Sequence, residues 1–130
     1  MLIQIDTQDA LPIYAQLRDQ IVLGIAAGRL GQGEALPSVR RLGADLGINF
    51  HTVGKAYTTL SDEGYIVMDR RRGAVVTQRL PGDEAFISCL GRSLKLSAAE
   101  AICHDMAKTE FLAFCEKSYL EAKSEKGESS

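Results

Sequence analysis

The chain has 130 residues and a mass of 14.1 kDa, and its 45% hydrophobic and 25% charged residues are typical of a globular protein. This length allows one small domain with an appendage and excludes a complete doubly wound cofactor fold beside a second domain. The net charge of −2 hides a gradient, because residues 29–79 carry eight Lys or Arg against five Asp or Glu, whereas residues 80–130 carry six against nine. The basic middle weakly favours a polyanionic partner, and the acidic total weakly opposes one.

The first elements that the sequence predicts are a short strand and a helix. Residues 2–5 form a short, partly β-branched run that is followed by polar residues, which favours a strand. Pro12 suits the first turn of a helix, and apolar residues recur at intervals of four from Ile13 to Ile25. We expect this helix to end near Ala27, because a glycine follows it.

Two short helices follow, with only a three-residue turn, 47–49, between them. Ser38 is suited to cap the first helix, and Asn49 is suited to cap the second. The apolar face of the second helix has the spacing i, i+3, i+4, i+7 from Val53 to Leu60. This arrangement is typical of a helix-turn-helix, and a close approach of its two helices would explain why the first one contains a glycine at position 43.

A β-hairpin is predicted directly after these helices. Residues 65–68 and 74–77 have the composition of strands, and the connection between them, residues 69–73, is a basic tip that ends in glycine. A hairpin in this position is a wing. The N-terminal strand could add a third strand to this small sheet.

Helical spacing resumes after a boundary at residues 81–82. One helix is predicted from Asp83 to about Lys95, and the Ser-x-x-Glu pattern that begins at Ser97 is a capping box, which predicts the start of another helix. The pattern leaves open whether that helix is continuous to about Ala122 or bends near residues 108–109.

The predicted fold class is therefore mainly α with a small antiparallel sheet. We expect a winged helix-turn-helix DNA-binding domain at residues 1–80 and a short α-helical dimerisation region at residues 81–123. The last residues, 124–130, are small and charged, which predicts disorder.

The composition contains no set of residues that points to catalysis or to a metal. The three cysteines lie in the last third of the chain without a C-x-x-C pair, so neither a disulfide framework nor a structural zinc site is expected. The two histidines, His51 and His104, fall in different segments, and no nucleophile motif or phosphate-binding loop is present. We expect a protein that is not an enzyme, has no cofactor and has no resident metal.

No membrane segment or signal peptide is expected either. No apolar run approaches the roughly 18 residues of a membrane span. The N-terminal residues lack a basic region followed by a long apolar stretch. These features predict a cytoplasmic protein.

Motifs in the middle of the chain resemble a known family. Residues 28–42 read Gly-x-Leu-x-x-Gly-x-x-Leu-Pro-Ser-x-Arg-x-Leu, which resembles the signature of the GntR family of bacterial winged-helix regulators. The patterns Asn49-x-x-Thr-Val-x-Lys-Ala-Tyr and Leu60-x-x-Glu-Gly, together with an opening Ile5-Asp and Pro12-Ile-Tyr-x-Gln, are similar to its YtrA-type subfamily. The resemblance covers residues 2 to about 78, and it implies a double-stranded DNA operator as partner and dimerisation through the helical tail.

Four positions depart from the family pattern. Val39 stands where the family often has glutamate, and Arg71 takes the place of the first wing glycine. Phe50 and His51 replace a frequent proline and a frequent asparagine. These changes affect the DNA sequence that is read and leave the fold unchanged.

The candidate DNA-binding residues come from the helical pattern and from the family resemblance. If the apolar face of the second short helix points inward, then His51, Thr52 and Lys55 can reach the major groove. The resemblance assigns DNA contact to Arg40, and its neighbour Arg41 reaches phosphate or solvent. Ser38 caps its helix, whose free N–H groups could also hold a phosphate. The wing residues 70–73 suit the minor groove or flanking phosphates. The complete predicted set is Ser38, Arg40, Arg41, His51, Thr52, Lys55, Arg71, Arg72 and Gly73.

The tail contains more apolar surface than two isolated short helices can bury, so we expect it to form a homodimer. The predicted interface residues are Phe86, Leu90, Leu94, Ile102, Met106 and Leu112. A two-fold dimer would read a pseudo-palindromic operator with recognition helices about one DNA turn apart. The resemblance implies a repressor, typically of an operon for an ABC transporter.

Two questions stay open at this point. A small-molecule effector, which no residue identifies, would bind between the tail helices or at the dimer interface. The alternative function is a winged-helix adaptor that binds protein and not DNA.

Overall fold

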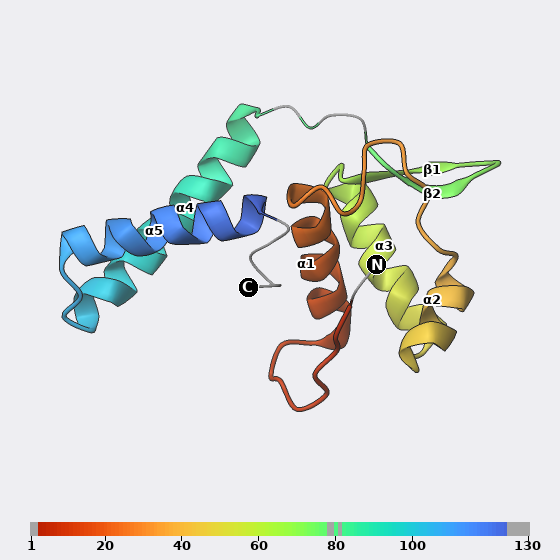
Figure 1. Ribbon diagram of the computed structural model, residues 1–130, viewed down its shortest axis with the longest axis horizontal. Coiled ribbons are helices and arrows are strands. Elements are labelled where there is room, and N and C mark those ends of the chain that lie inside the picture. The colour runs from red at the N-terminus through yellow and green to blue at the C-terminus, as the bar shows by residue number, and fades with distance from the viewer. Residues whose placement is uncertain (1–2, 78–79, 81, 125–130) are drawn as a thin grey trace. The chain divides into compact units, whose positions relative to one another are not determined.

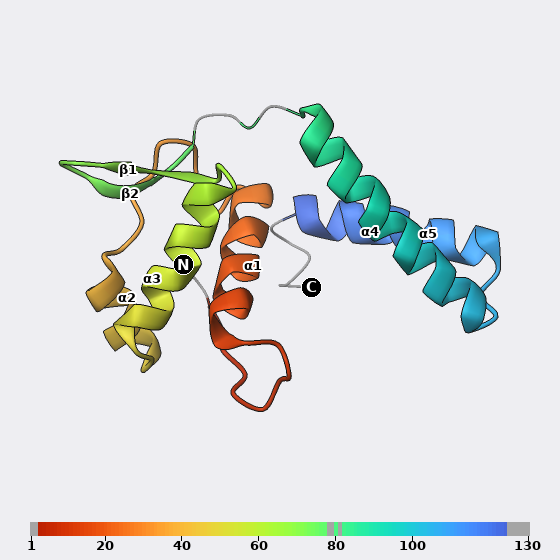
Figure 2. The same ribbon diagram turned by 180° about the vertical axis from the view of Figure 1, so that it is seen from behind.

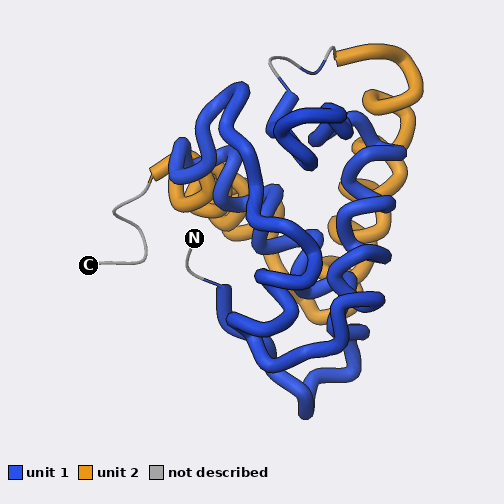
Figure 3. The backbone as a smooth tube through the Cα atoms, turned by 90° about the vertical axis from the view of Figure 1, so that its right-hand side faces the viewer, with its two compact units in different colours: residues 1–80 blue, residues 81–130 orange. Residues whose placement is uncertain are grey.

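The structure is a computed structural model, and it describes residues 3–77, 80 and 82–124 (Figures 1 and 2). The chain divides into two compact units, unit 1 at residues 1–80 and unit 2 at residues 81–130 (Figure 3). Unit 1 contains the helices α1 (Ile13–Ala26), α2 (Val39–Leu46) and α3 (Phe50–Asp62). They are followed by a hairpin of the strands β1 (Ile66–Asp69) and β2 (Gly73–Val76). Unit 2 contains α4 (Glu84–Cys103) and α5 (Lys108–Lys123). These elements confirm the predicted fold class.

The core of unit 1 is built around α3, which packs against α1, α2 and β1. Each of these elements contributes its apolar face, as the periodicity predicts. The largest fully buried side chains are Leu17, Ile21, Val53, Leu60, Ile66 and Val76. Burial of each such side chain stabilises the fold by about 1.5–3 kcal/mol, so this core holds α3 in a fixed orientation.

The two helices of the helix-turn-helix begin at the predicted caps. The Ser38 hydroxyl accepts a hydrogen bond from the backbone N–H of Arg41 at 3.1 Å, and the Asn49 side chain accepts one from the N–H of His51 at 2.8 Å. Gly47 ends α2 with a φ of 69°, a left-handed conformation that glycine adopts without strain.

Gly43 permits the tight turn between α2 and α3. A Cβ atom at this position would lie 2.9 Å from the carbonyl oxygen of Ile48 and 3.2 Å from the Cα atom of Phe50. The close approach is therefore between α2 and the backbone of the turn and the first residue of α3.

A segment that the sequence did not predict for this place lies beside the two-stranded sheet. β1 pairs with β2 in antiparallel register from Ile66 opposite Val76 to Asp69 opposite Gly73. On the other side of β2, the N–H of Leu36 donates to the carbonyl of Ala74 at 2.8 Å, and residue 35 forms an isolated bridge with residue 75. The loop before α2 thus borders the hairpin, whereas the sequence suggested that the N-terminal segment could add a third strand there.

The predicted N-terminal strand is wrong for residues 3–5, which are not in a strand. Ile3 and Ile5 pack on the core, and the Gln20 side chain of α1 forms hydrogen bonds with the backbone of Gln4 between them. The N–H of Gln4 donates to Oε1 of Gln20 at 2.8 Å. Residues 3–5 therefore lie along α1 and do not pair with the hairpin.

The first helix of unit 2, α4, spans a region where the sequence predicted the end of one helix and the start of another. α4 is continuous through Ser97, so the prediction that a new helix starts there is wrong. A Ser-x-x-Glu pattern acts as a cap only where the preceding chain leaves the helix, and residues 92–96 contain neither glycine nor proline to cause this. The break comes at residues 104–107, where Asp105 has a φ of 62°, and α5 begins at Lys108.

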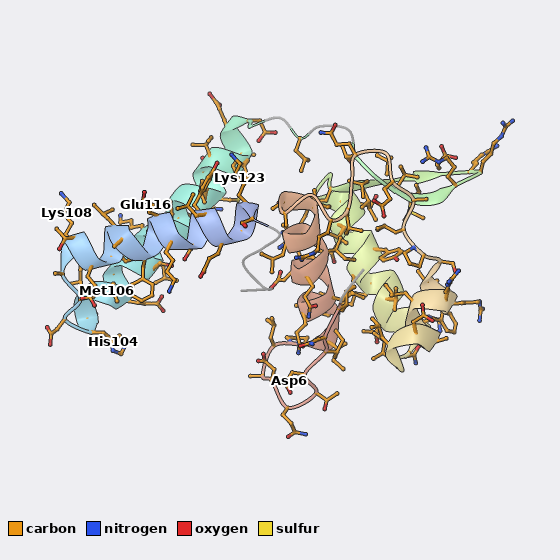
Figure 4. The ribbon with its side chains drawn as sticks, viewed as in Figure 1. Asp6, His104, Met106, Lys108, Glu116 and Lys123 are labelled. Atoms are coloured by element: carbon orange, nitrogen blue, oxygen red, sulfur yellow. The ribbon has the colours of Figure 1, made fainter. Side chains whose placement is uncertain are left out.

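Of the two alternatives for the tail, the bend near residues 108–109 is thus the one that the structure contains. Figure 4 shows His104 and Met106 beside this turn, and Lys108, Glu116 and Lys123 along α5. The N-terminus of α4 is capped by Asp83, whose carboxylate accepts a hydrogen bond from the N–H of Phe86 at 2.9 Å. The predicted disordered tail, residues 124–130, lies outside the described residues except for Ser124.

Candidate nucleic-acid interface

The polar face of α3 points outward from unit 1, as its pattern predicts. His51 and Lys55 are exposed, and Thr52 is half-buried beside them. On the opposite face, Tyr57 is buried and its hydroxyl donates to the carbonyl of Pro37 at 2.7 Å, while burial raises the pKa of the phenol. This hydrogen bond joins α3 to the residue before the α2 cap, so the two helices of the motif hold a fixed relation.

Lys55 makes a contact that the sequence does not predict. Its ammonium nitrogen lies 4.1 Å from the centroid of the Tyr14 ring on α1. A cation–π contact of this kind at an exposed site contributes about 0.5–1 kcal/mol. A DNA phosphate or a guanine can accept hydrogen bonds from the Lys55 ammonium in place of this ring contact. The contact therefore leaves Lys55 available to a ligand.

An aromatic ring joins α2 to the start of α3. The guanidinium carbon of Arg40 lies 4.2 Å from the centroid of the Phe50 ring, and the His51 ring lies 4.2 Å from the same centroid with an interplanar angle of 33°. Sequence reasoning identified Arg40 and His51 but missed Phe50. The available signal was the departure from the family's frequent proline at position 50.

Arg41 and Ser38 have different surroundings from Arg40. The Arg41 side chain is paired with Asp45 one turn later in α2, at 3.8 Å. The Ser38 hydroxyl is used in the cap of α2. Of these three predicted residues, Arg40 is therefore the one whose charged group is free to meet a ligand without breaking an ion pair or a cap.

The tip of the wing is organised by one acidic side chain. The carboxylate of Asp69 accepts hydrogen bonds from the backbone N–H groups of Arg71 at 2.7 Å and Arg72 at 3.1 Å, and these bonds lower the pKa of the Asp69 carboxyl. Gly73 follows with a φ of 76°. The turn exposes the side chains of residues 70–72 at the end of the hairpin.

The three wing arginines are not equivalent. The guanidinium of Arg72 donates a hydrogen bond to the carbonyl of Gly33, in the loop that borders β2. Arg72 therefore attaches the wing to the body of unit 1, whereas the Arg71 guanidinium has no such hydrogen bond to any described residue. Figure 1 shows the hairpin tip and α2 on the same side of unit 1, so one elongated ligand could contact both.

Four of the six predicted dimer residues lie on α4, Met106 lies in the turn after it, and Leu112 lies on α5. Five of the six are exposed, with values from 43% for Leu90 to 70% for Ile102, and Met106 is half-buried. No described residue of α4 or α5 is buried. The apolar side chains of unit 2 are thus available to a partner.

The described part of the chain lacks any group of three or more His, Cys, Asp or Glu side chains that could hold a metal ion. Within residues 3–77 and 82–124, no helix is both long and apolar enough to cross a membrane.

A capped helix-turn-helix followed by an arginine-tipped hairpin defines a winged helix-turn-helix domain, the class of fold that presents a helix to DNA. The family model described as "Bacterial regulatory proteins, gntR family" matches residues 10–76. The chain belongs to the gntR family, and it is a transcriptional regulator of that family.

Two curated relatives support this assignment and its subfamily. The chain is 30% identical over 106 residues to the HTH-type transcriptional regulator Rv1152 of Mycobacterium tuberculosis, across 77% of this chain and 88% of the relative. It is 39% identical over 77 residues to the HTH-type transcriptional repressor YtrA of Bacillus subtilis, across 59% of each protein. Both relatives are regulators, which agrees with the prediction that the chain is not an enzyme.

Solved structures show the same fold. A transcriptional antiterminator from Listeria monocytogenes EGD-e has a TM-score of 0.85 at 22% identity, over 91% of this chain and 90% of that one. YtrA from Sulfolobus acidocaldarius, a GntR-family transcription factor, has a TM-score of 0.61 at 41% identity, over 73% of this chain and 99% of that one. The DNA-binding domain of AraR in complex with operator ORE1 has a TM-score of 0.50 at 25% identity, over 59% of this chain and 94% of that one. With the Bacillus relative, the Sulfolobus structure supports the YtrA-type subfamily.

Proposed function

We propose that the chain is a repressor that binds a pseudo-palindromic operator as a homodimer. In this proposal α3 of each protomer lies in a major groove, and the wing contacts the adjacent backbone or minor groove. The observation that carries the proposal is the exposed donor face at the N-terminal half of α3, on a winged helix-turn-helix domain. The AraR domain of similar fold is bound to an operator, and the Bacillus relative is named a repressor.

The charges on α3 suit a groove of DNA. His51, Thr52 and Lys55 supply hydrogen-bond donors, and the first acidic residue of α3 is Asp62, which is also its last residue. The major groove of B-DNA admits a helix and presents acceptors on guanine, adenine and thymine. A repulsive carboxylate near the start of α3 would oppose this docking, and α3 has none there.

The homodimer is proposed from the surface of unit 2. A pair of helices without a buried residue has no core of its own, so its apolar side chains need cover from another molecule. A second copy of the chain is the occupant that also supplies the second half of a pseudo-palindromic reader. The exposed large apolar residues of unit 2 are Phe86, Ile87, Leu90, Leu94, Leu96, Ile102, Leu112, Phe114, Tyr119 and Leu120.

The regulated genes are proposed from subfamily alone. Resemblance to the YtrA type implies repression of an operon for an ABC transporter, in the cytoplasm, where the chromosome lies. Sequencing of genomic fragments that the full-length chain selects would identify its site, the symmetry of that site and the neighbouring genes. Recovery of fragments without a shared motif would oppose sequence-specific binding.

DNA binding is tested by titration of a labelled random duplex at two salt concentrations. A regulator binds more weakly as the salt concentration rises, with a slope of about −0.9 in log K against log salt for each phosphate contact. Replacement of Lys55 and Arg71 by alanine should weaken binding and make the slope less steep. Lys117→Ala on α5 removes a charge that is outside the winged helix-turn-helix domain and should change neither. Absence of binding at low salt would support the adaptor function instead.

Dimerisation is tested by sedimentation equilibrium of charge-introducing variants. Leu90→Asp places a carboxylate on the apolar surface of α4 and should shift the chain toward monomer. Ser88→Asp introduces the same charge at an exposed polar position of α4 and should leave the mass unchanged. A wild-type chain that is monomeric at micromolar concentration would overturn the dimer.

A further inference from the structure

We infer that Phe50 is a positioning residue for DNA recognition, because its ring contacts both the guanidinium of Arg40 and the ring of His51 at the start of α3. The inference rests on the proposed DNA-binding function, and it assigns a role to a residue that contributes no hydrogen bond of its own. Arg40 belongs to α2 and His51 to α3, so the ring couples the two helices of the motif at the surface. Both contacts to the ring centroid measure 4.2 Å.

The contact with the Phe50 ring leaves the N–H donors of the Arg40 guanidinium without a described protein partner. No described residue forms a hydrogen bond or an ion pair with its guanidinium, which therefore keeps its N–H groups for a ligand. Arg41, the next residue, shows the contrast, because its guanidinium is paired with Asp45 at 3.8 Å. Two adjacent arginines of α2 are thus held in different ways, and only one is held by a contact that consumes no donor.

A cation–π contact uses the charge of the guanidinium and forms no conventional hydrogen bond, so the planar fork of N–H groups can meet a second partner. A planar fork of this kind matches the two acceptors of guanine in the major groove, O6 and N7. Without the ring, the long side chain of Arg40 would sample many rotamers, and binding would have to immobilise them. The ring therefore pre-organises Arg40 for a guanine, and the tilted contact with the His51 ring supports the position of the Phe50 ring.

The position of Phe50 explains why the ring can do this. It is the first residue of α3 and is half-buried, with its backbone close to the turn that Gly43 permits. The frequent proline of the family has no π face and cannot hold a guanidinium in this way. The chain is thus expected to differ from proline-containing relatives in its preference for guanine at the base pair that Arg40 contacts.

A double-mutant cycle tests the inference. The probe is a duplex that the full-length chain selects from a random pool, and a random duplex of the same length measures non-specific affinity. Phe50→Ala should weaken binding to the selected duplex about two- to fivefold per half-site, the equivalent of an exposed cation–π contact, and should leave binding to the random duplex unchanged. In an Arg40→Ala background the same substitution should have no further effect, whereas in an Arg41→Ala background its effect should persist.

Two further variants separate the aromatic face from simple packing. Phe50→Tyr keeps the ring and should retain affinity, and Phe50→Leu keeps apolar volume without a π face and should behave as the alanine variant does. Additive effects of Phe50→Ala and Arg40→Ala, or full affinity in Phe50→Leu, would overturn the inference while the proposed function stands. A wild-type chain that selects no duplex from the random pool would overturn the proposed function and the inference together.

Discussion

Substitution of Gly43 by alanine tests whether the turn between α2 and α3 is as tight as the structure indicates. The new Cβ atom would lie 2.9 Å from the carbonyl oxygen of Ile48 and 3.3 Å from the backbone nitrogen of Phe50. Both neighbours are backbone atoms, so they cannot move aside by a change of rotamer. The substitution therefore forces a shift of the turn itself.

The size of the effect follows from two opposing contributions. Replacement of glycine by alanine in a helix interior stabilises by about 1 kcal/mol, and forced overpacking costs about 1–3 kcal/mol. Gly54 in α3 is the matched control, because its added Cβ would meet no atom within 4 Å. Since the helix contribution is common to both, Gly43→Ala should have a free energy of unfolding about 1–3 kcal/mol below that of Gly54→Ala.

The assay is urea denaturation followed by far-ultraviolet circular dichroism, with all proteins at one concentration so that association contributes equally. Gly54→Ala should be more stable than the wild type, and Gly43→Ala should be equal to it or less stable. An increase of equal size in both variants would refute the reasoning, because it would show that the turn has space for a methyl group.

Two other predictions concern the loop before α1 and the wing. Gln16 is buried, and its side-chain amide donates hydrogen bonds to the carbonyls of Asp6 at 2.9 Å and Leu11 at 2.8 Å. Gln16→Ala should therefore lower the free energy of unfolding by about 1–3 kcal/mol in the same assay. An unchanged free energy of unfolding would show that water replaces these hydrogen bonds without cost. The pKa of Asp69 is lowered in the fold by the N–H groups of Arg71 and Arg72, so the stabilisation of the wing turn is complete above the unfolded-state pKa and is lost as the pH falls through the folded value. An NMR titration should give a midpoint below 3.8, with the two arginine amide signals shifting together with it, and a midpoint at or above 3.8 would contradict the turn geometry.

The helices of unit 1 could be predicted from the sequence because their signals are local. A capping side chain acts on an N–H group two or three residues away, and an apolar stripe repeats within one helix. Ser38 and Asn49 therefore marked the starts of α2 and α3 correctly. The same local reasoning failed at Ser97, where the capping pattern is present but the chain never leaves the helix.

The outward direction of His51 and Lys55 was also predictable, because the buried face of α3 determines its opposite face. The family motifs extended this prediction to Arg40 and to the wing. The sequence by itself thus determined the order of α1, α2, α3 and the hairpin in unit 1, the class of fold and the side of α3 that faces solvent.

Only the tertiary structure decided which distant residues meet. The contacts of Arg40 with Phe50, Lys55 with Tyr14 and the Arg72 guanidinium with the Gly33 carbonyl join residues that are 10 to 41 positions apart. The loop before α2, and not the N-terminus, borders β2 for the same reason. Such contacts depend on how the packed core places whole elements relative to one another, and no periodicity or cap within a single segment contains that information.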